Sequence, residues 1–243
     1  MTSIFFKELN HFFSSLVGYI AITVFLVATG LFIWIFPDTN LLDYGYATLE
    51  GLFITAPYIF LFLVPAITMR TFAEEKSSGT IEMLVTKPIN DVSIILGKYL
   101  ATLVLIAFAI FPTLLYYLTI YLLGAPVGNI DTGAVHGSYI GLFLLAASFA
   151  AIGVFASSIT SNQIVAFVLA LFLCFFFFLA FEFLSRLPIL FAGFDYLVEQ
   201  LGINAHYRSI SRGVIDTRDI VYFLSLIVFF LSCTKISLES RKW

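Results

Sequence analysis

Charged residues are scarce in this sequence. Asp, Glu, Lys and Arg make up only 11% of the 243 residues, whereas a soluble domain averages about 25%. Hydrophobic residues make up 61%, and the mean hydropathy is +1.04. This balance excludes an ordinary soluble domain and predicts a protein that crosses a membrane several times. The basic residues are also too few and too scattered for a nucleic-acid surface, so no nucleic-acid partner is expected.

Catalytic motifs are missing as well. The sequence has no GxxxxGK[ST] loop, whose amides cradle nucleotide phosphates, so the chain is not expected to hydrolyse ATP alone. Its three histidines lie outside any HExxH motif, and no GxSxG element supplies a serine nucleophile. We therefore predict that the chain is not an enzyme and holds no cofactor or metal of its own. Cys174 and Cys233 fall inside apolar runs, which indicates reduced packing residues rather than a disulfide.

What the chain does contain is a series of long apolar runs. They lack the period-two alternation of barrel strands, so helices are favoured. We predict an all-α polytopic membrane protein in which residues 1–243 form one transmembrane domain. Each span is long enough to cross a hydrocarbon core of about 30 Å. The six expected transmembrane helices lie near residues 16–36, 52–69, 99–123, 138–158, 163–184 and 219–236.

The first fifteen residues predict an amphipathic helix that lies in the membrane interface. They are not a signal peptide, because polar and charged residues interrupt them and no small-residue cleavage site follows. A frayed leader to the first span is the alternative. The apolar face at helical spacing consists of Phe5, Leu9, Phe12, Phe13 and Leu16.

The basic residues predict the orientation, because cytoplasmic loops of membrane proteins carry an excess of Lys and Arg. With the N-terminus inside, every lysine faces the cytoplasm. Both termini and the segment 70–98 are then cytoplasmic, as six spans require, and the expected location is the bacterial inner membrane. The arginines left outside all belong to one loop: Arg186, Arg208, Arg212 and Arg218.

The outer segment 185–218 is too apolar for an ordinary hydrated loop. One interpretation is a broken helical pair that dips into the outer leaflet, with Asp216 or Thr217 capping the last span. A helical cap on the outer surface is weighted equally. Glu182 is an ionisable residue near the outer end of the span 163–184, and its spacing from Arg186 favours an (i, i+4) pair over an ion relay.

The segment 70–98 is the longest charged interruption in the apolar first half of the chain. Thr71 and Glu74 match the capping-box pattern, so we expect a helix to restart there as the second span leaves the membrane. Gly79 then allows a sharp turn. The alternative is an inert solvated loop.

A short amphipathic helix is expected after this turn. Thr80 would cap it, and Pro88 would end it. Asn90 or Asp91 would then cap the helix that enters the membrane as the third span. Glu82 and Lys87 would stay in water, while one apolar face would be formed by Ile81, Leu84 and Val85.

At these residues the sequence resembles a known family. The pattern EEKxxGTxExLxxxP between a second and a third span is similar to the cytoplasmic signature of ABC-2 type transporter permeases, and the likeness covers the whole chain. More narrowly, the chain resembles the GldF-type permease subunits of gliding-motility complexes, partly through residues 211–223. Copper-maturation permeases of similar size and other ABC-2 exporters are the alternatives to this narrower resemblance. The residues of the signature are Glu74, Glu75, Lys76, Gly79, Thr80, Glu82, Leu84 and Pro88.

The resemblance implies a type V exporter-like ABC-2 fold. Residues 79–86 would form a coupling helix seated in a cleft of an ATPase subunit. That subunit would bind ATP and Mg²⁺, and it would work as a dimer. The lipid bilayer, a second permease subunit and a protein with a large periplasmic domain would be the other partners. The expected contacts to the ATPase are Glu74, Glu75, Gly79, Thr80, Ile81, Glu82, Leu84 and Pro88.

The expected function is therefore that of a permease subunit in an ATP-driven exporter, with gliding motility as the narrower expectation. Two alternatives stay open at this point. One is an ion-coupled secondary carrier, which would need ionisable groups inside the membrane. The other is a membrane scaffold for motility or secretion that moves no substrate.

Overall fold

A computed structural model describes residues 1–37, 40–41, 45–81, 90–187 and 194–240, and in these ranges the only regular elements are helices. In chain order they are α1 (Thr2–Ser14), α2 (Leu16–Trp34), α3 (Glu50–Thr68), α4 (Arg70–Ser77), α6 (Asp91–Ile110), α7 (Leu114–Leu123), α8 (Thr132–Ile159), α9 (Gln163–Phe175), α10 (Phe181–Ser185), α11 (Asp195–Glu199), α12 (Ile203–Ile210) and α13 (Thr217–Glu239). A 3-10 turn, η1 (Phe111–Thr113), joins α6 to α7, and a π-helical turn, η2 (Phe176–Ala180), joins α9 to α10.

Within the described residues, five helical stretches are long and apolar enough to cross a membrane. A sixth results if α1 and α2, which meet at a bend of 67°, are taken together. The prediction of an all-helical, multi-pass membrane protein is therefore confirmed. The five stretches are Glu50–Ser77, Asp91–Leu123, Thr132–Ile159, Gln163–Ser185 and Thr217–Glu239.

Several helices begin at a residue whose side chain accepts a hydrogen bond from an amide of the first turn. The side chain of Asn90 accepts a hydrogen bond from Val92 N at the start of α6. The side chain of Asp131 does the same for Ala134 N at the start of α8, and Asp216 caps α13. The caps expected at Asn90 and Asp216 are thus present.

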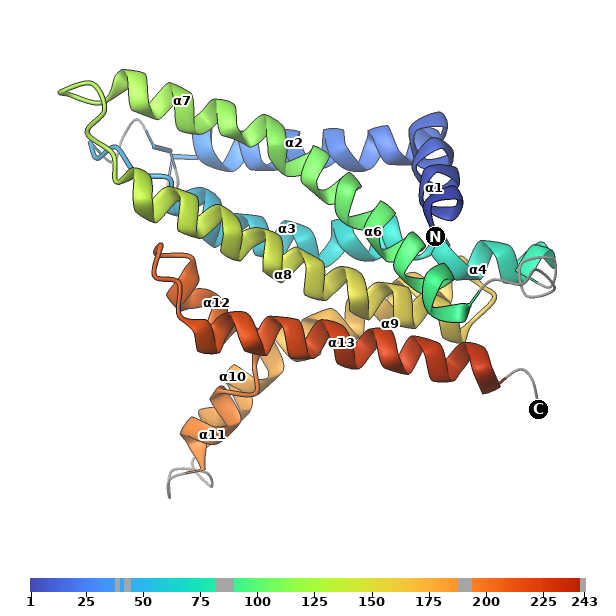
Figure 1. The fold of residues 1–243 in the computed structure, drawn as a ribbon. Coiled ribbons are helices and arrows are strands. Elements are labelled where there is room, and N and C mark those ends of the chain that lie inside the picture. The colour runs from blue at the N-terminus through green and yellow to red at the C-terminus, as the bar shows by residue number, and fades with distance from the viewer. Residues whose placement is uncertain (38–39, 42–44, 82–89, 188–193, 241–243) are drawn as a thin grey trace.

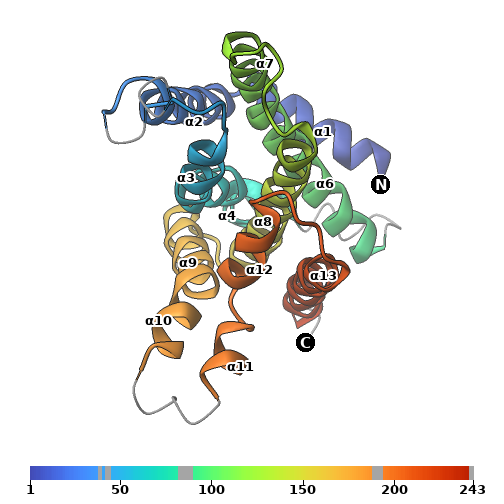
Figure 2. The same ribbon diagram turned by 90° about the vertical axis from the view of Figure 1, so that its left-hand side faces the viewer.

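Helix α8 lies at the centre of the bundle (Figures 1 and 2). In its apolar stretch 78% of the residues are buried, against 22% for α13 and for the stretch formed by α9 and α10. Small residues on α8 let its neighbours approach closely, as in other membrane helix pairs. A Cβ placed on Gly153 would lie 2.0 Å from Thr68 Oγ1 of α3, and one on Gly141 would lie 2.3 Å from Ile210 Cγ2 of α12.

The two ends of the bundle differ. The N-terminus, α1, α4 and the end of α13 lie at one end, which we call the termini end (Figure 1). At the opposite end, α10 and α11 leave the bundle sideways as a pair, and α12 returns to α8 and α13 (Figures 1 and 2). Tyr207 of α12 donates a hydrogen bond to Phe53 O of α3 at 2.7 Å, which ties this return to the core.

A buried His206–Asp219 pair joins α12 to α13. His206 Nδ1 lies 2.7 Å from Asp219 Oδ1, and Nε2 lies 2.9 Å from Gln200 O. The ring also stacks on Tyr222, with centroids 3.9 Å apart.

Candidate functional site

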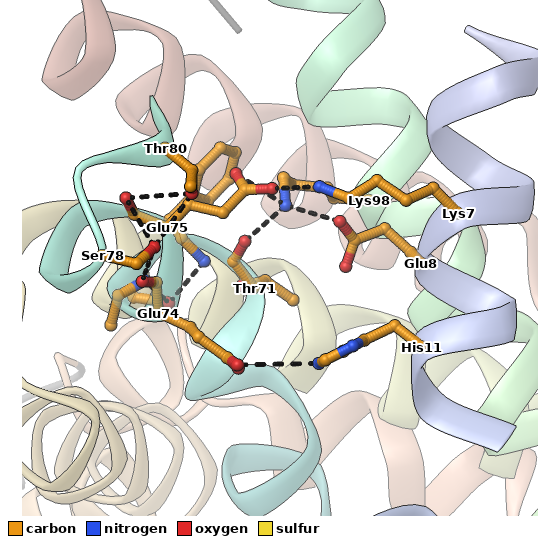
Figure 3. Close-up of polar contacts among 12 residues, drawn as sticks. Lys7, Glu8, His11, Thr71, Glu74, Glu75, Ser78, Thr80 and Lys98 are labelled. Carbon is orange, nitrogen blue, oxygen red and sulfur yellow. Dashed lines mark hydrogen bonds and ion pairs between the residues drawn. The ribbon is translucent and has the colours of Figure 1, made fainter. Parts of the chain in front are cut away.

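Four charged side chains meet at the termini end of the bundle, and we call them the ion-pair cluster: Lys7, Glu8, Glu75 and Lys98 (Figure 3). They come from three helices that are far apart in sequence. α1 supplies Lys7 and Glu8, α4 supplies Glu75, and α6 supplies Lys98. Because α4 and α6 flank residues 82–89 in the sequence, the cluster lies at the base of the expected coupling segment.

Lys98 is the centre of the cluster. Its side chain is only 1% exposed. Its Nζ donates to Glu8 Oε1 at 2.7 Å and to Thr71 O at 2.6 Å. Glu75 Oε2 lies 3.0 Å away as an ion pair without hydrogen-bond alignment. One ammonium group therefore fastens α6 to both α1 and α4. A buried charge persists only when paired and hydrogen-bonded in this way.

Lys7 balances the cluster from the solvent side. Its Nζ donates to Glu75 Oε1 at 2.8 Å, so two lysines face two glutamates. Partial burial opposes the charge of Lys7, but the hydrogen bond and charge of Glu75, with Glu8 and Glu74, outweigh this and raise the pKa of Lys7 above its ordinary value of 10.5. Because the pKa of Lys7 is higher in the folded state, protonated Lys7 stabilises the folded protein at pH values below 10.5. This stabilisation is lost as the pH rises through the pKa of Lys7 in the folded state. The cluster therefore combines two basic and two acidic side chains.

The start of α4 is fixed by α8, which corrects the expected capping box. Thr71 Oγ1 donates to Thr68 O instead of capping the helix. The hydroxyl of Ser157 accepts from both Phe72 N and Ala73 N at 3.0 Å, and it donates to Met69 O. The helix does restart after Met69, but its cap comes from a residue more than 80 positions away in the sequence. Capping-box spacing could not show that a distant hydroxyl would occupy the place.

Lys76 secures the same junction from the other side. Its Nζ donates a hydrogen bond to Ser158 O, close to the C-terminal end of α8. Cations near the C-terminus of a helix also interact favourably with its dipole. The last turn of α8 therefore contacts both ends of α4: Ser157 binds its first turn, and Ser158 O accepts from Lys76 in its last turn.

Ser157→Ala should loosen this junction, because it removes an acceptor for two buried amides and a donor to a third backbone group. We expect a loss of about 1–2 kcal/mol in the free energy of unfolding and faster amide exchange at Phe72 and Ala73, measured by hydrogen–deuterium exchange. Ser240→Ala is the control, since Ser240 is exposed and bonds only within its own turn. Equal exchange in both variants would show that the cap is not needed.

The structure places the predicted site residues in two different settings. Glu74 is partly exposed, and its Oε1 lies 3.7 Å from His11 Nε2. Glu75, expected to contact an ATPase, is 8% exposed and contacts lysines of its own chain instead. Its carboxylate is therefore part of the internal cluster, and only Glu74 of the two faces outward.

The turn after α4 has the geometry that its glycine predicts. Gly79 has a φ of 69°, a conformation that other residues rarely adopt. The hydroxyl of Thr80, expected to cap the next helix, lies 2.9 Å from Ser78 Oγ and bonds back to Glu75 O. Ile81 is half-buried against the core. Glu82, Leu84 and Pro88 lie outside the described residues, so their contacts stay predictions.

Two residues of the cluster escaped the sequence analysis. In the sequence, Glu8 stands among the charges that interrupt the first fifteen residues and Lys98 at the end of the charged segment 70–98, and no contact between them is predicted. Both are buried, because each supplies the other's counter-charge across 90 positions of sequence. One signal was available: Lys98 stands inside the apolar run of α6, after Ile94, Ile95 and Leu96. A lone charge in such a run indicates a buried partner.

A cavity of about 150 Å³ opens beside the cluster, bordered by the charged residues and by Arg70, His11 and Thr80. Among the described residues, no three His, Cys, Asp or Glu side chains are placed to hold a metal ion. The arrangement can join helices and transmit a displacement between them.

A family model described as ABC-2 family transporter protein matches residues 49–234. The matched region includes Glu75 and Lys98, whereas α1, with Lys7 and Glu8, precedes it. A search of curated proteins found no match.

Proposed function

This chain belongs to the ABC-2 family of transporter proteins, and from that premise we propose that it is a permease subunit driven by ATP hydrolysis in a separate ATPase. Members of this family are transmembrane subunits that normally work with an ABC ATPase. ATP and Mg²⁺ would be bound by that partner. The sequence between α4 and α6 would receive its movement.

The observation that carries the proposal is that Lys98 binds α1 and α4 at once. A displacement of the segment between α4 and α6 acts directly on the ends of these two helices. Lys98 and Glu8 pass the same displacement to α1. Separating the buried charges would leave each unpaired, which costs about 3–5 kcal/mol. The three helix ends therefore move together as one rigid unit, and α1 carries the movement on to α2.

A finer assignment is supported by residue placement. The described lysines belong to α1, α4, the start of α6 and the end of α13, all at the termini end, whereas Arg186, Arg208, Arg212 and Arg218 belong to the opposite end. This asymmetry supports cytoplasmic termini in a bacterial inner membrane. The resemblance of residues 211–223 supports an exporter of the gliding-motility type, in which this chain pairs with a second permease and a partner with a large periplasmic domain.

Gly79 and Gly45 provide a matched test of the coupling segment. Both have positive φ angles, 69° and 68°, and a Cβ on either would meet nothing within 4 Å. Valine at either position costs about 1–3 kcal/mol of backbone strain. We expect Gly79→Val to reduce co-purification of the ATPase at least about tenfold, since 1.4 kcal/mol is a factor of ten in affinity, while Gly45→Val at the opposite end retains it.

Co-purification of an ABC ATPase and ATP-dependent activity of the reconstituted complex test the function itself. Membrane insertion is measured for both variants, so that loss of the ATPase is not confused with loss of the protein. Equal retention of the ATPase by both variants would contradict the coupling role of Gly79. Transport on a proton or sodium gradient without ATPase subunits would instead support a secondary carrier.

A further inference from the structure

The base of the pair formed by α10 and α11 carries two arginines that share one carboxylate. Arg186 Nη2 and Arg208 Nη2 each donate to Glu182 Oε1 at 2.5 Å. Asn204 Nδ2 donates to the other oxygen, Oε2, at 2.6 Å. The (i, i+4) pair expected between Glu182 and Arg186 is therefore present, and it is joined by two residues of α12. Both guanidinium groups are held in place by the same acceptor.

The charges of this group do not balance. Two guanidinium groups face one carboxylate, which leaves a net charge of +1. The side chain of Glu182 is 13% exposed, while those of Arg186 and Arg208 are 65% and 50% exposed. Within the described residues, neither arginine forms an ion pair with Asp195 or Glu199 of α11. Each guanidinium carries five N–H donors in a planar fork, so most donors face outward.

The surface around the two arginines is apolar. α10 and α11 project sideways from the bundle at the end opposite the termini (Figures 1 and 2), so the rest of this chain leaves their outer faces uncovered. Large apolar side chains are exposed along both helices and just beyond them: Phe183, Leu184, Leu187, Phe194, Tyr196, Leu197 and Leu201. Exposure of so large an apolar surface to water is unfavourable.

The depth of the arginines follows from the span that precedes them. Arg186 comes directly after the apolar stretch Gln163–Ser185, and a stretch of this length that crosses the hydrocarbon core would bring Arg186 to its edge. Arg208 reaches the same carboxylate from α12 and therefore lies at the same depth. That depth is the headgroup region, where Arg contacts phosphate and where Tyr residues such as Tyr196 gather.

We propose that Arg186 and Arg208 bind the phosphate of an anionic glycerophospholipid, in the leaflet opposite the termini, while its acyl chains cover α10 and α11. The net charge of +1 matches one phosphodiester. A headgroup with an amine or a choline would place an additional positive charge beside the two arginines. Lipids with anionic headgroups are therefore preferred. This inference depends on the chain spanning a membrane and is independent of the ATPase partner.

Native mass spectrometry of the purified chain, titrated with phosphatidylglycerol or phosphatidylcholine, tests the site. We expect wild type to retain phosphatidylglycerol preferentially, by about tenfold, which corresponds to about 1.4 kcal/mol of binding free energy. Arg186→Gln with Arg208→Gln should remove the preference. Arg218→Gln, which removes an arginine of α13 at the same end but outside this group, should keep it.

The melting temperature of each variant in lipid-free detergent shows whether the variant is folded. If the double variant is unfolded, the single variant Arg186→Gln is used in its place, because Glu182 then keeps Arg208 as its partner. The preference of this single variant for phosphatidylglycerol over phosphatidylcholine should fall at least threefold. An unchanged preference in the folded variants would overturn the site. So would binding of phosphatidylcholine equal to that of phosphatidylglycerol, or cross-linking of Leu197→Cys between two copies, which would show that a second protein chain covers this face.

Discussion

Lys98→Met is expected to destabilise the protein by about 3–5 kcal/mol and to uncouple α1 from the bundle. The substitution keeps an unbranched side chain of similar length but removes the ammonium group that Glu8 and Glu75 share. Both carboxylates stay buried, with Lys7 as the one remaining lysine partner of Glu75. The free energy of unfolding in detergent and amide exchange in α1 measure the two effects.

The loss of stability should arise from the burial of the charges, and two further variants test this. Lys235→Met removes an exposed (i, i+4) pair with Glu239, in which the charged atoms are 3.6 Å apart, so we expect a change within about 0.5 kcal/mol. Combining Lys98→Met with Glu8→Gln and Glu75→Gln removes the unpaired charges and should recover much of the stability. If Lys98→Met proved as mild as Lys235→Met, the cluster would not hold the helices together.

Gly153→Ala is the second substitution with a large expected effect, because it adds a methyl group where two helices touch. That Cβ would lie 2.0 Å from Thr68 Oγ1 and 2.7 Å from Thr68 Cβ. Rotating the hydroxyl relieves the first contact but not the second, so α3 and α8 must separate. Overpacking of this kind costs about 1–3 kcal/mol. Thermal unfolding and loss of ATPase-dependent activity measure the consequence, since α4 continues from α3.

The same helix supplies the control for this substitution. Gly133 stands in the first turn of α8, and a Cβ there would meet only Asp131 Oδ1, at 3.4 Å. Gly133→Ala should therefore be neutral, or stabilising by up to about 1 kcal/mol through helix propensity. Removing the facing side chain, with Thr68→Gly in the Gly153→Ala background, should restore part of the loss. Additive losses in that double variant would show that the two residues do not compete for space.

Local features of the fold were predictable from the sequence. Long apolar runs predict helices that cross a membrane, Asn90 and Asp216 predict caps, and Gly79 predicts a turn with positive φ. Each of these depends on residues within one or two turns of each other. The short helices α11 and α12 and the sideways departure of α10 were not predictable in detail, because they depend on contacts such as that of Tyr207 with α3.

The candidate site was predictable only in part. The signature around Gly79 locates the segment, but it says nothing of which carboxylates turn inward. Glu74 and Glu75 are neighbours in the sequence, yet Glu74 is partly exposed and Glu75 is buried against Lys98. The difference arises from helix packing, since consecutive residues on a helix point in directions about 100° apart. Only the position of α1 and α6 decides which of the two meets a lysine.

The pairing of Glu8 with Lys98 also implies an order of events during synthesis of the protein. A ribosome releases Glu8 and Glu75 well before Lys98, which follows Glu8 by 90 residues. Until the third span emerges, the nascent chain holds two acids for which Lys7 is the only neighbouring lysine of the cluster. Helix α1 can therefore form its buried ion pair with the bundle only after α6 has been synthesised. Docking of α1 then indicates that the first half of the protein has been inserted.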